Sequence, residues 1–250
     1  MQTFYLVIFG MFGLIIGSFL NVCIYRIPQK ISVVYGRSYC DNCHHTLAPL
    51  DLIPVFSYLF LGGKCRYCKA KISPRLPLVE LLTGILYILI YLRFSLSILS
   101  VIYCLLVSVL IVMAGIDYDT QEVKDPTLIA LALLSIFVII FDYRSLSNIL
   151  GGLLVMPLIM LVIYFGSKGK ALGTGDIYFV AITGSFLGLG RSILNVGLAY
   201  VLAALTLIPK LVKKKMAADT AIPMIPFFAF STIICILYGD QIIAWYLSLF

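Results

Sequence analysis

Long apolar runs separated by short polar segments make up most of the chain. Apolar runs of about 17 to 25 residues have the length that a helix needs to cross a bilayer. Candidate runs lie at residues 4–24, 78–93, 95–114, 127–143, 146–165, 176–191, 193–209 and 222–249. The pattern therefore predicts about eight membrane-spanning helices, with one long polar segment, residues 26–77, after the first of them.

The composition agrees with this pattern and excludes a water-soluble globule. Hydrophobic residues make up 62% of the chain and charged residues 12%, and the mean hydropathy is +1.09. We therefore expect an all-α polytopic membrane protein that has the lipid bilayer as a partner. The formal net charge of +7 does not indicate a nucleic-acid partner, because the basic residues fall in short loops between apolar runs.

Lysine and arginine predict the orientation of these helices. Fifteen of them fall on one side, with eight in residues 26–77 and the others at Lys124, Lys168, Lys170, Lys210 and Lys213–Lys215. The opposite side holds three, at Arg93, Arg144 and Arg191. Because basic loops stay in the cytoplasm, we place the long polar segment there and both termini outside. No basic residue precedes Arg26, so we expect the first apolar run to remain as an anchor.

Two cysteine pairs lie in the long polar segment. The motifs CDNC and CRYC are separated by 21 residues, which suits a tetrahedral site of four thiolates that holds Zn²⁺. A segment of about 50 residues also needs such a staple, because its own core is too small. Iron fits the same ligands, whereas two disulfides are disfavoured in a reducing cytoplasm. The predicted ligands are Cys40, Cys43, Cys65 and Cys68.

The other histidines and cysteines have simpler interpretations. His44 and His45 directly follow the first cysteine pair, but four well-spaced thiols leave these histidines as solvated loop residues. The remaining cysteines lie in apolar runs, where we expect them to pack as small hydrophobic side chains. They are Cys23, Cys104 and Cys235.

Two aspartates lie at the ends of apolar runs, where a carboxylate is costly and is usually functional. Asp117 lies in GIDYDTQEVKDP and Asp176 in GTGD. A pair of carboxylates that shares one proton can activate a water for peptide hydrolysis. Helix dipoles would favour the ionised form of Asp176, at the start of a run, and the protonated form of Asp117, near the end of one. The plain alternatives are a solvated acidic turn and a helix N-cap.

The first of these aspartates has acidic neighbours. Asp117, Asp119 and Asp125 all lie within nine residues. Asp117 shares a helical face with Leu110 and Met113, whereas Asp119 is turned about 200° away from it. We therefore favour Asp117 as the functional carboxylate and keep Asp119 as a possible contact for water or substrate.

Glycines surround the second aspartate. Gly173 and Gly175 would allow unusual dihedral angles and close packing just before the helix that follows. Gly184 and Gly188 then give a small-xxx-small spacing, which permits tight packing against a neighbouring helix. Such packing could bring the two aspartates together.

Several motifs, in this order, resemble the type IV prepilin peptidase family. They are GSFLNVCIYRIP at 17–28, the cysteine pairs, the segment 51–84 from DLIPVFSYLF to PLVELLTG, GID at 115–117 and GTGD at 173–176. The compact length and the cysteine pairs look most like the Gram-positive competence or pilus branch. The chain departs from the family pattern at Ile177-Tyr178, Asp125-Pro126 and Pro223-Met224-Ile225-Pro226. These departures bear on substrate preference more than on catalysis.

The resemblance implies an aspartic endopeptidase of the bacterial cytoplasmic membrane that cleaves type IV prepilins or pseudopilins at the cytoplasmic face. The family also methylates the new N-terminus with S-adenosylmethionine, although the chain has no glycine-rich nucleotide motif that would show this independently. The implied catalytic residues are Asp117 and Asp176, with Gly173 and Gly175 as supporting motif residues. The implied domains are a membrane helix at 1–25, a zinc-binding loop domain at 26–77 and a membrane peptidase domain at 78–250.

Two other classes of function and one further residue stay open. A proton-coupled transporter would also place acids at helix breaks, but it would not need four thiolates. A thiol oxidoreductase would use the CxxC pairs, but on the oxidising side of the membrane. Glu80, just inside the second predicted span, could pair with Arg75 or assist methyl transfer.

Overall fold

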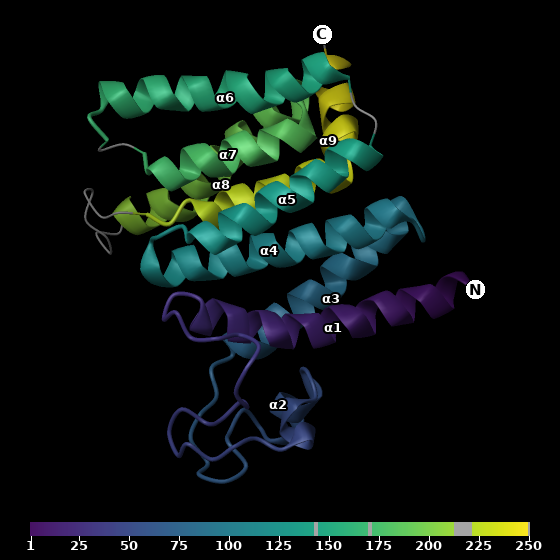
Figure 1. Cartoon of the computed structure of the whole chain (residues 1–250), viewed down its shortest axis with the longest axis vertical. Coiled ribbons are helices and arrows are strands. Elements are labelled where there is room, and N and C mark those ends of the chain that lie inside the picture. The colour runs from purple at the N-terminus through teal and green to yellow at the C-terminus, as the bar shows by residue number, and fades with distance from the viewer. Residues whose placement is uncertain (143–144, 170–171, 213–221, 250) are drawn as a thin grey trace. The chain divides into compact units, whose positions relative to one another are not determined.

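The computed structural model describes residues 1–142, 145–169, 172–212 and 222–249, without the side chains of residues 209–212 (Figure 1). Within these residues the regular structure is helical, with two isolated β-bridges in the cysteine-rich loop. The predicted all-helical fold is therefore confirmed. The long helices are α1 Gln2–Arg26, α3 Arg75–Phe94, α4 Ile98–Thr120, α5 Asp125–Phe141, α6 Leu146–Gly166, α7 Thr174–Leu187, α8 Leu189–Val212 and α9 Ile225–Leu247, and the short ones are η1 Pro49–Leu52 and α2 Phe56–Phe60.

Six helices among the described residues are long and apolar enough to cross a membrane, namely α1, α3, α4, α6, α8 and α9. Helices α5, with 17 residues, and α7, with 14, are shorter, and 14 residues rise only about 21 Å. Each predicted apolar run overlaps one of the long helices, except the run at 176–191, which overlaps α7 and the start of α8, so the chain is a multi-pass membrane protein. Of the basic residues that predict the orientation, Arg144, Lys170 and Lys213–Lys215 lie outside the described residues, as does the side chain of Lys210.

Two helix ends differ from the predicted runs near the aspartates. Helix α4 ends at Thr120 rather than at residue 114, so Asp117 lies within the helix. The run predicted at 176–191 instead breaks after Leu187, and α8 begins at Leu189. Gly188 makes this break with a φ of +79°, a conformation that residues with a side chain rarely adopt.

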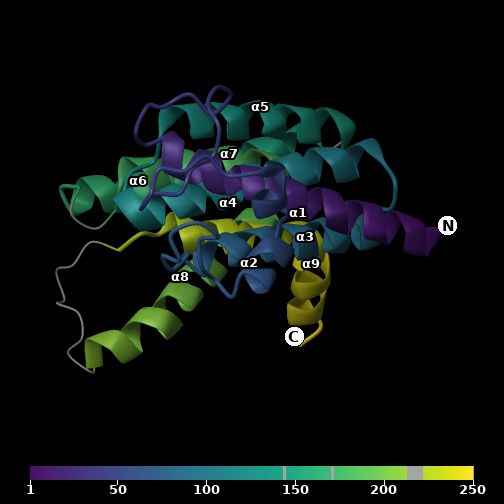
Figure 2. The same ribbon diagram turned by 90° about the horizontal axis from the view of Figure 1, so that it is seen from below.

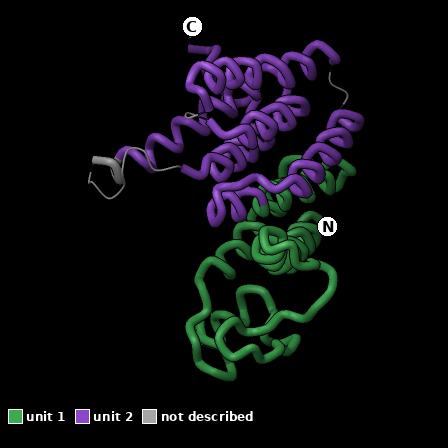
Figure 3. Tube along the Cα trace, turned by 60° about the vertical axis from the view of Figure 1, so that its left-hand side comes forward, with its two compact units in different colours: residues 1–112 green, residues 113–250 purple. Residues whose placement is uncertain are grey.

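The chain forms two compact units, residues 1–112 and 113–250 (Figure 3). The predicted domain limits near residues 25 and 77 separate membrane helices from the loop domain and do not correspond to these compact units. These limits stay a prediction. In unit 1, α1 packs against α3 through glycines. A Cβ on Gly13 would lie 2.7 Å from the Cα of Gly84, and a Cβ on Gly17 would lie 2.7 Å from the Cα of Glu80. These positions leave no room for a side chain, so the two helix backbones approach closely.

In unit 2, α6 and α7 cross at Gly152 and Gly184. A Cβ on Gly152 would lie 2.0 Å from the carbonyl oxygen of Gly184, and the reverse distance would be 2.1 Å. The tight packing predicted from Gly184 is confirmed, but its partner is α6 and not the helix that carries Asp117. At the same crossing, the side chain of Asn148 in α6 accepts the backbone N–H of Leu189 at 2.9 Å.

Helices α8 and α9 pack around a buried polar cluster. Asn195 of α8 accepts hydrogen bonds from Ser231 and Thr232 of α9, and all three residues are almost fully buried. Hydrogen bonds of this kind hold membrane helices together. Farther along the chain, the C-terminal part of α8 diverges from α9 (Figure 2).

Candidate active site and metal centre

Asp117 lies in the last turn of α4, on the buried face of this helix. The residue is 5% exposed, and Leu110 and Met113 on the same face are 0% and 3% exposed. Its Oδ2 atom accepts a hydrogen bond of 3.0 Å from the backbone N–H of Ile225, the first residue of α9. A carboxylate at the N-terminus of a helix is stabilised by the unpaired N–H groups there and by the helix dipole.

The other two acids near Asp117 are placed differently. Asp119 is exposed, two positions later in the same helix. Asp125 is exposed at the first position of α5. The helical positions therefore predicted correctly which aspartate of this group is buried.

Asp176 is the third residue of α7 and is partly buried. Its carboxylate is hydrogen-bonded to the backbone of Gly173, the N-cap residue of the helix. Neither Gly173 nor Gly175 has a positive φ, so the expectation of unusual dihedral angles is wrong for both. Gly175 is instead required for close packing, because a Cβ at this position would lie 2.6 Å from a methyl carbon of Val123. Val123 belongs to the short loop after α4, so this contact joins the two segments that carry the aspartates.

The two carboxylates interact within unit 2. The charge of Asp117 acts electrostatically on Asp176, and Asp176 acts in the same way on Tyr200 of α8. Both carboxylates accept backbone hydrogen bonds at the start of a helix, Asp176 in its own α7 and Asp117 at α9. Each aspartate therefore has a helix N-terminus beside it, so helix dipoles alone do not distinguish the two, and the assignment of the ionised member stays a prediction.

Three groups at this site were not predicted from the sequence. The Ile225 N–H had an indirect signal, because Pro226 favours the first turn of a helix and so indicates where α9 begins. Val123 and Tyr200 carried no sequence signal. Val123 lies against Gly175, and Tyr200 interacts with Asp176, only because α7 packs against the loop after α4 and against α8, which local patterns do not show.

The cysteine pairs in unit 1 fold into two equivalent turns. The N–H of Cys40 donates to the carbonyl oxygen of His45 at 3.0 Å, and the N–H of Cys65 donates to the carbonyl oxygen of Ala70 at 2.8 Å. Each cysteine pair therefore lies in a loop of the same length and hydrogen bonding. The residue after the second cysteine has a positive φ in both turns, at His44 and Lys69. One β-bridge flanks each pair, Tyr39 with Thr46 and Lys64 with Lys71. His44 thus has a structural place in the first turn, and the ring of His45 lies on that of Tyr67.

These turns bring the four predicted thiols together. The sulfur atoms of Cys40, Cys43, Cys65 and Cys68 all lie within 4.8 Å of one another. The Sγ atoms of Cys40 and Cys68 are 3.8 Å apart, about the edge of a tetrahedron with metal–sulfur bonds of about 2.3 Å. A disulfide would need about 2.05 Å, and none of the seven cysteines forms one. The cluster therefore fits a four-thiolate metal site better than a pair of disulfides.

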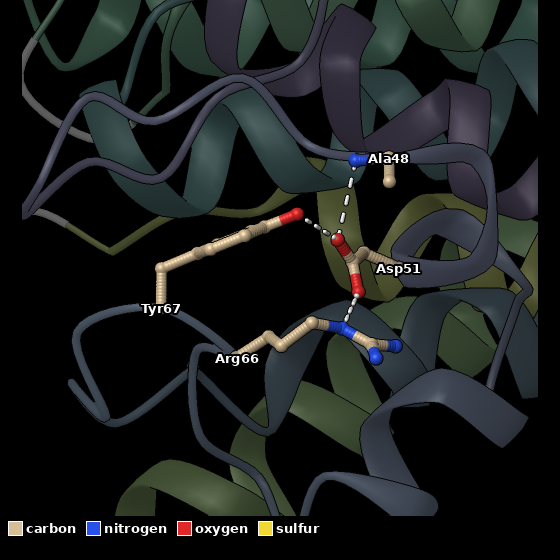
Figure 4. Close-up of polar contacts among 4 residues, drawn as sticks. All are labelled: Ala48, Asp51, Arg66 and Tyr67. Atoms are coloured by element: carbon tan, nitrogen blue, oxygen red, sulfur yellow. Dashed lines mark hydrogen bonds and ion pairs between the residues drawn. The ribbon is translucent and has the colours of Figure 1, made fainter.

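A buried acid joins the second cysteine turn to η1 (Figure 4). The Asp51 side chain is 3% exposed and forms an ion pair of 2.6 Å with Arg66. It also accepts the Ala48 N–H at 3.1 Å and the Tyr67 hydroxyl at 3.2 Å. Burial disfavours ionisation of Asp51, but these contacts outweigh it and hold the pKa of Asp51 below its ordinary value.

Glu80 of α3 is the other buried acid in unit 1 and is 8% exposed. Its carboxylate accepts the backbone N–H of Val55 at 2.7 Å, and it is also hydrogen-bonded to the side chain of Ser18. Val55 has a φ of +62°, which is rare for a residue branched at Cβ. The main contact of Glu80 is thus with the start of α2, and the suggested pairing with Arg75 stays a prediction.

Comparison with known proteins agrees with this geometry. Residues 11–94 match the bacterial peptidase A24 N-terminal domain, and residues 104–208 match the type IV leader peptidase family. A prepilin leader peptidase/N-methyltransferase of Bacillus subtilis is 31% identical over 95% of this chain and 96% of its own length. An Aeromonas salmonicida protein of the same name is 30% identical over 95% and 92%. No solved structure matches significantly. The chain belongs to the type IV leader peptidase family.

Proposed function

We propose that this chain is a prepilin leader peptidase in which Asp117 and Asp176 form the catalytic pair. The observation that carries the proposal is the electrostatic interaction of these two carboxylates, one buried and one partly buried. Each lies in the first or last turn of its helix, near an end of a predicted membrane span rather than at its middle. The relatives named as prepilin leader peptidases support the reaction class.

The pair acts as a general acid and a general base. Two neighbouring carboxylates do not both hold a negative charge, so the pair shares one proton. The ionised member takes a proton from water, and the resulting hydroxide attacks the scissile carbonyl carbon. The protonated member donates its proton to the carbonyl oxygen and so stabilises the tetrahedral intermediate. The carboxyl that took the proton from water then gives it to the leaving amine nitrogen as the C–N bond breaks, and the intermediate's hydroxyl returns its proton to the other carboxylate as the carbonyl re-forms. The Ile225 N–H holds one oxygen of Asp117 in place, which leaves its other oxygen for water or substrate.

The substrates are type IV prepilins or pseudopilins, whose leader is cut at the cytoplasmic face of the bacterial membrane. The same enzyme methylates the new N-terminus, as the names of its relatives state for them. S-adenosylmethionine would be the methyl donor. The cavity beside α2 is not a complete site for this molecule, because its lysines could meet the methionine carboxylate but its lining has no acidic residue for the ribose hydroxyls. No residues are assigned to methyl transfer.

The four thiols hold a structural zinc ion. All four ligand positions come from cysteine, so the site is closed and has no open position for catalysis. A metal bound there would join the two cysteine turns of a segment that has few buried apolar residues of its own. The metal would act only as a crosslink between the two turns.

Co-expression with a prepilin, followed by mass spectrometry of the prepilin N-terminus, tests the catalytic pair. Asp117→Asn and Asp176→Asn should each lower cleavage by about 10³-fold or more, as removal of a catalytic acid or base does. Asp119→Asn is the matched control, because it removes an exposed carboxylate from the same helix. Continued cleavage by a membrane-inserted variant that lacks both Asp117 and Asp176 would contradict the proposal and leave the transporter to be tested.

A further inference from the structure

The loop domain of unit 1 exposes an apolar segment, residues 50–60, which includes the last three residues of η1 and all of α2. Six large apolar side chains in this segment are between 40% and 87% exposed. A group of this size is unusual on a surface that faces only water, and it commonly marks an interaction site. Its members are Leu50, Leu52, Ile53, Phe56, Leu59 and Phe60.

A hydrogen bond to Glu80 fixes the position of the apolar segment along the length of the membrane helices of unit 1. Val55, in the middle of the segment, donates its N–H to Glu80, which is the sixth residue of the membrane helix α3. The Cα of Glu80 lies against Gly17 of α1, nine residues before that helix ends at Arg26. Nine residues of helix rise about 13 Å. The apolar segment therefore lies beside the membrane helices of unit 1 and not beyond their ends (Figures 1 and 2).

The backbone conformation of Val55 indicates that contacts with the rest of unit 1 hold the apolar segment in this position. A valine with φ of +62° and ψ of −50° is outside the common conformations of L residues. Such a conformation persists only where surrounding contacts hold it. The contact that holds it is the buried Glu80 carboxylate, so α3 keeps α2 in place.

Basic residues lie next to the apolar segment. A cavity of about 470 Å³ adjoins α2 and is lined in part by Tyr58, Lys64, Lys71 and Ser73. Residues 26–75 contain eight lysines and arginines but only two acids, Asp41 and Asp51, and Asp51 is already paired with an arginine. The surface is therefore complementary to a negatively charged layer.

We propose that residues 50–60 form an interfacial anchor that inserts into the leaflet of an anionic bilayer. The apolar side chains lie among the upper parts of the acyl chains, and Lys64 and Lys71 bind the lipid phosphates above them. Apolar side chains next to lysines are the composition of elements that lie in the plane of a membrane surface. The bilayer is the occupant because Glu80 ties the segment to helices that already cross it. The anchor holds the cysteine-rich loop domain against the membrane.

Tryptophan fluorescence in proteoliposomes tests the anchor on the full chain. The chain has a single tryptophan, so Trp245→Phe gives a background in which Phe60→Trp reports on α2 alone. Thr46→Trp, an exposed position in the first cysteine turn, is the matched control. Brominated lipids should quench Phe60→Trp at least about twofold more strongly than Thr46→Trp if the segment is inserted. Equal and weak quenching at both positions would overturn the proposal.

Two further measurements separate lipid from protein as the occupant. The quenching of Phe60→Trp should be stronger in phosphatidylglycerol than in phosphatidylcholine vesicles, and Lys64→Gln with Lys71→Gln should remove this difference. Its absence in the chain with both lysines would overturn the role of the lipid phosphates. A Phe60→Trp signal that ignores brominated lipid but responds to added prepilin would assign the surface to the substrate and overturn the proposal.

Discussion

At the scale of single residues, Gly175 controls how closely α7 approaches the loop after α4. A Cβ there would lie 2.6 Å from Val123, so Gly175→Ala must displace the first turn of α7, which carries Asp176. A shift of about 1 Å at a catalytic group lowers activity by about 10²-fold. We expect a loss of about 10- to 100-fold in kcat/KM for leader cleavage, measured with purified enzyme and prepilin.

Gly173→Ala is the control for this prediction. A Cβ on Gly173 would meet only the Asp176 carboxylate, at 3.4 Å, which is an ordinary contact. Its φ is negative, so alanine fits the backbone. We expect near-normal cleavage by Gly173→Ala and partial recovery when Val123→Ala is combined with Gly175→Ala. Equal losses in the two glycine variants would show that packing against Val123 is not the cause.

The sequence could predict those residue positions that depend on local periodicity. The burial of Asp117 and the exposure of Asp119 follow from a rotation of about 100° per residue in a helix. The Ile225 N–H beside Asp117 could not be predicted in this way, because the bond joins residues 108 positions apart. For the same reason, the dipole argument that separated the two aspartates did not include the start of α9, which lies beside Asp117.

At the scale of helices, the crossing of α6 and α7 depends on Gly152 and Gly184, where the neighbouring helix leaves no room for a side chain. Gly152→Ala would place a Cβ 2.0 Å from the Gly184 carbonyl oxygen, so the helices must separate. We expect a loss of about 2 to 3 kcal/mol in stability, seen as a lower Tm of the purified protein in detergent.

Gly197→Ala in α8 is the matched control for the helix crossing. Nothing lies within 4 Å of a Cβ at Gly197, and alanine has the higher helix propensity by about 1 kcal/mol. Its Tm should be unchanged or raised. A Gly152→Ala variant as stable as the Gly197→Ala variant would contradict the close crossing.

The cysteine turns lead to a prediction about metal content. Purified protein should contain one zinc ion per chain by elemental analysis, and Cys40→Ser with Cys65→Ser should lose it. Proteolysis should then cut residues 27–74 much faster, because metal binding supplies much of the folding energy of so small a domain. Cys104→Ser, at a buried cysteine of α4, should keep the metal. Iron in the wild-type protein, or zinc that survives in the double variant, would contradict the assignment.

Helix partners were harder to predict than helices or cysteine turns. Apolar runs located each long helix, because the length of a membrane span leaves little freedom, and the CxxC spacing located the thiol cluster. The glycines of α7 predicted close packing but not its partner, since a pattern of small residues does not indicate which helix will pack against it. The break at Gly188 was missed because apolar composition continues across it.

At the scale of the whole molecule, fifteen basic residues against three predict that the cysteine-rich loop and the ends of α4 and α7 near the aspartates face the cytoplasm. Leader cleavage requires this, because a prepilin leader stays on that side. Alkaline phosphatase, active only outside, and green fluorescent protein, fluorescent only inside, can be fused after Ile72, Ser97 and Glu122. We expect fluorescence after Ile72 and Glu122 and phosphatase activity after Ser97. The reverse pattern would separate the aspartates from the leader and so contradict the proposed function.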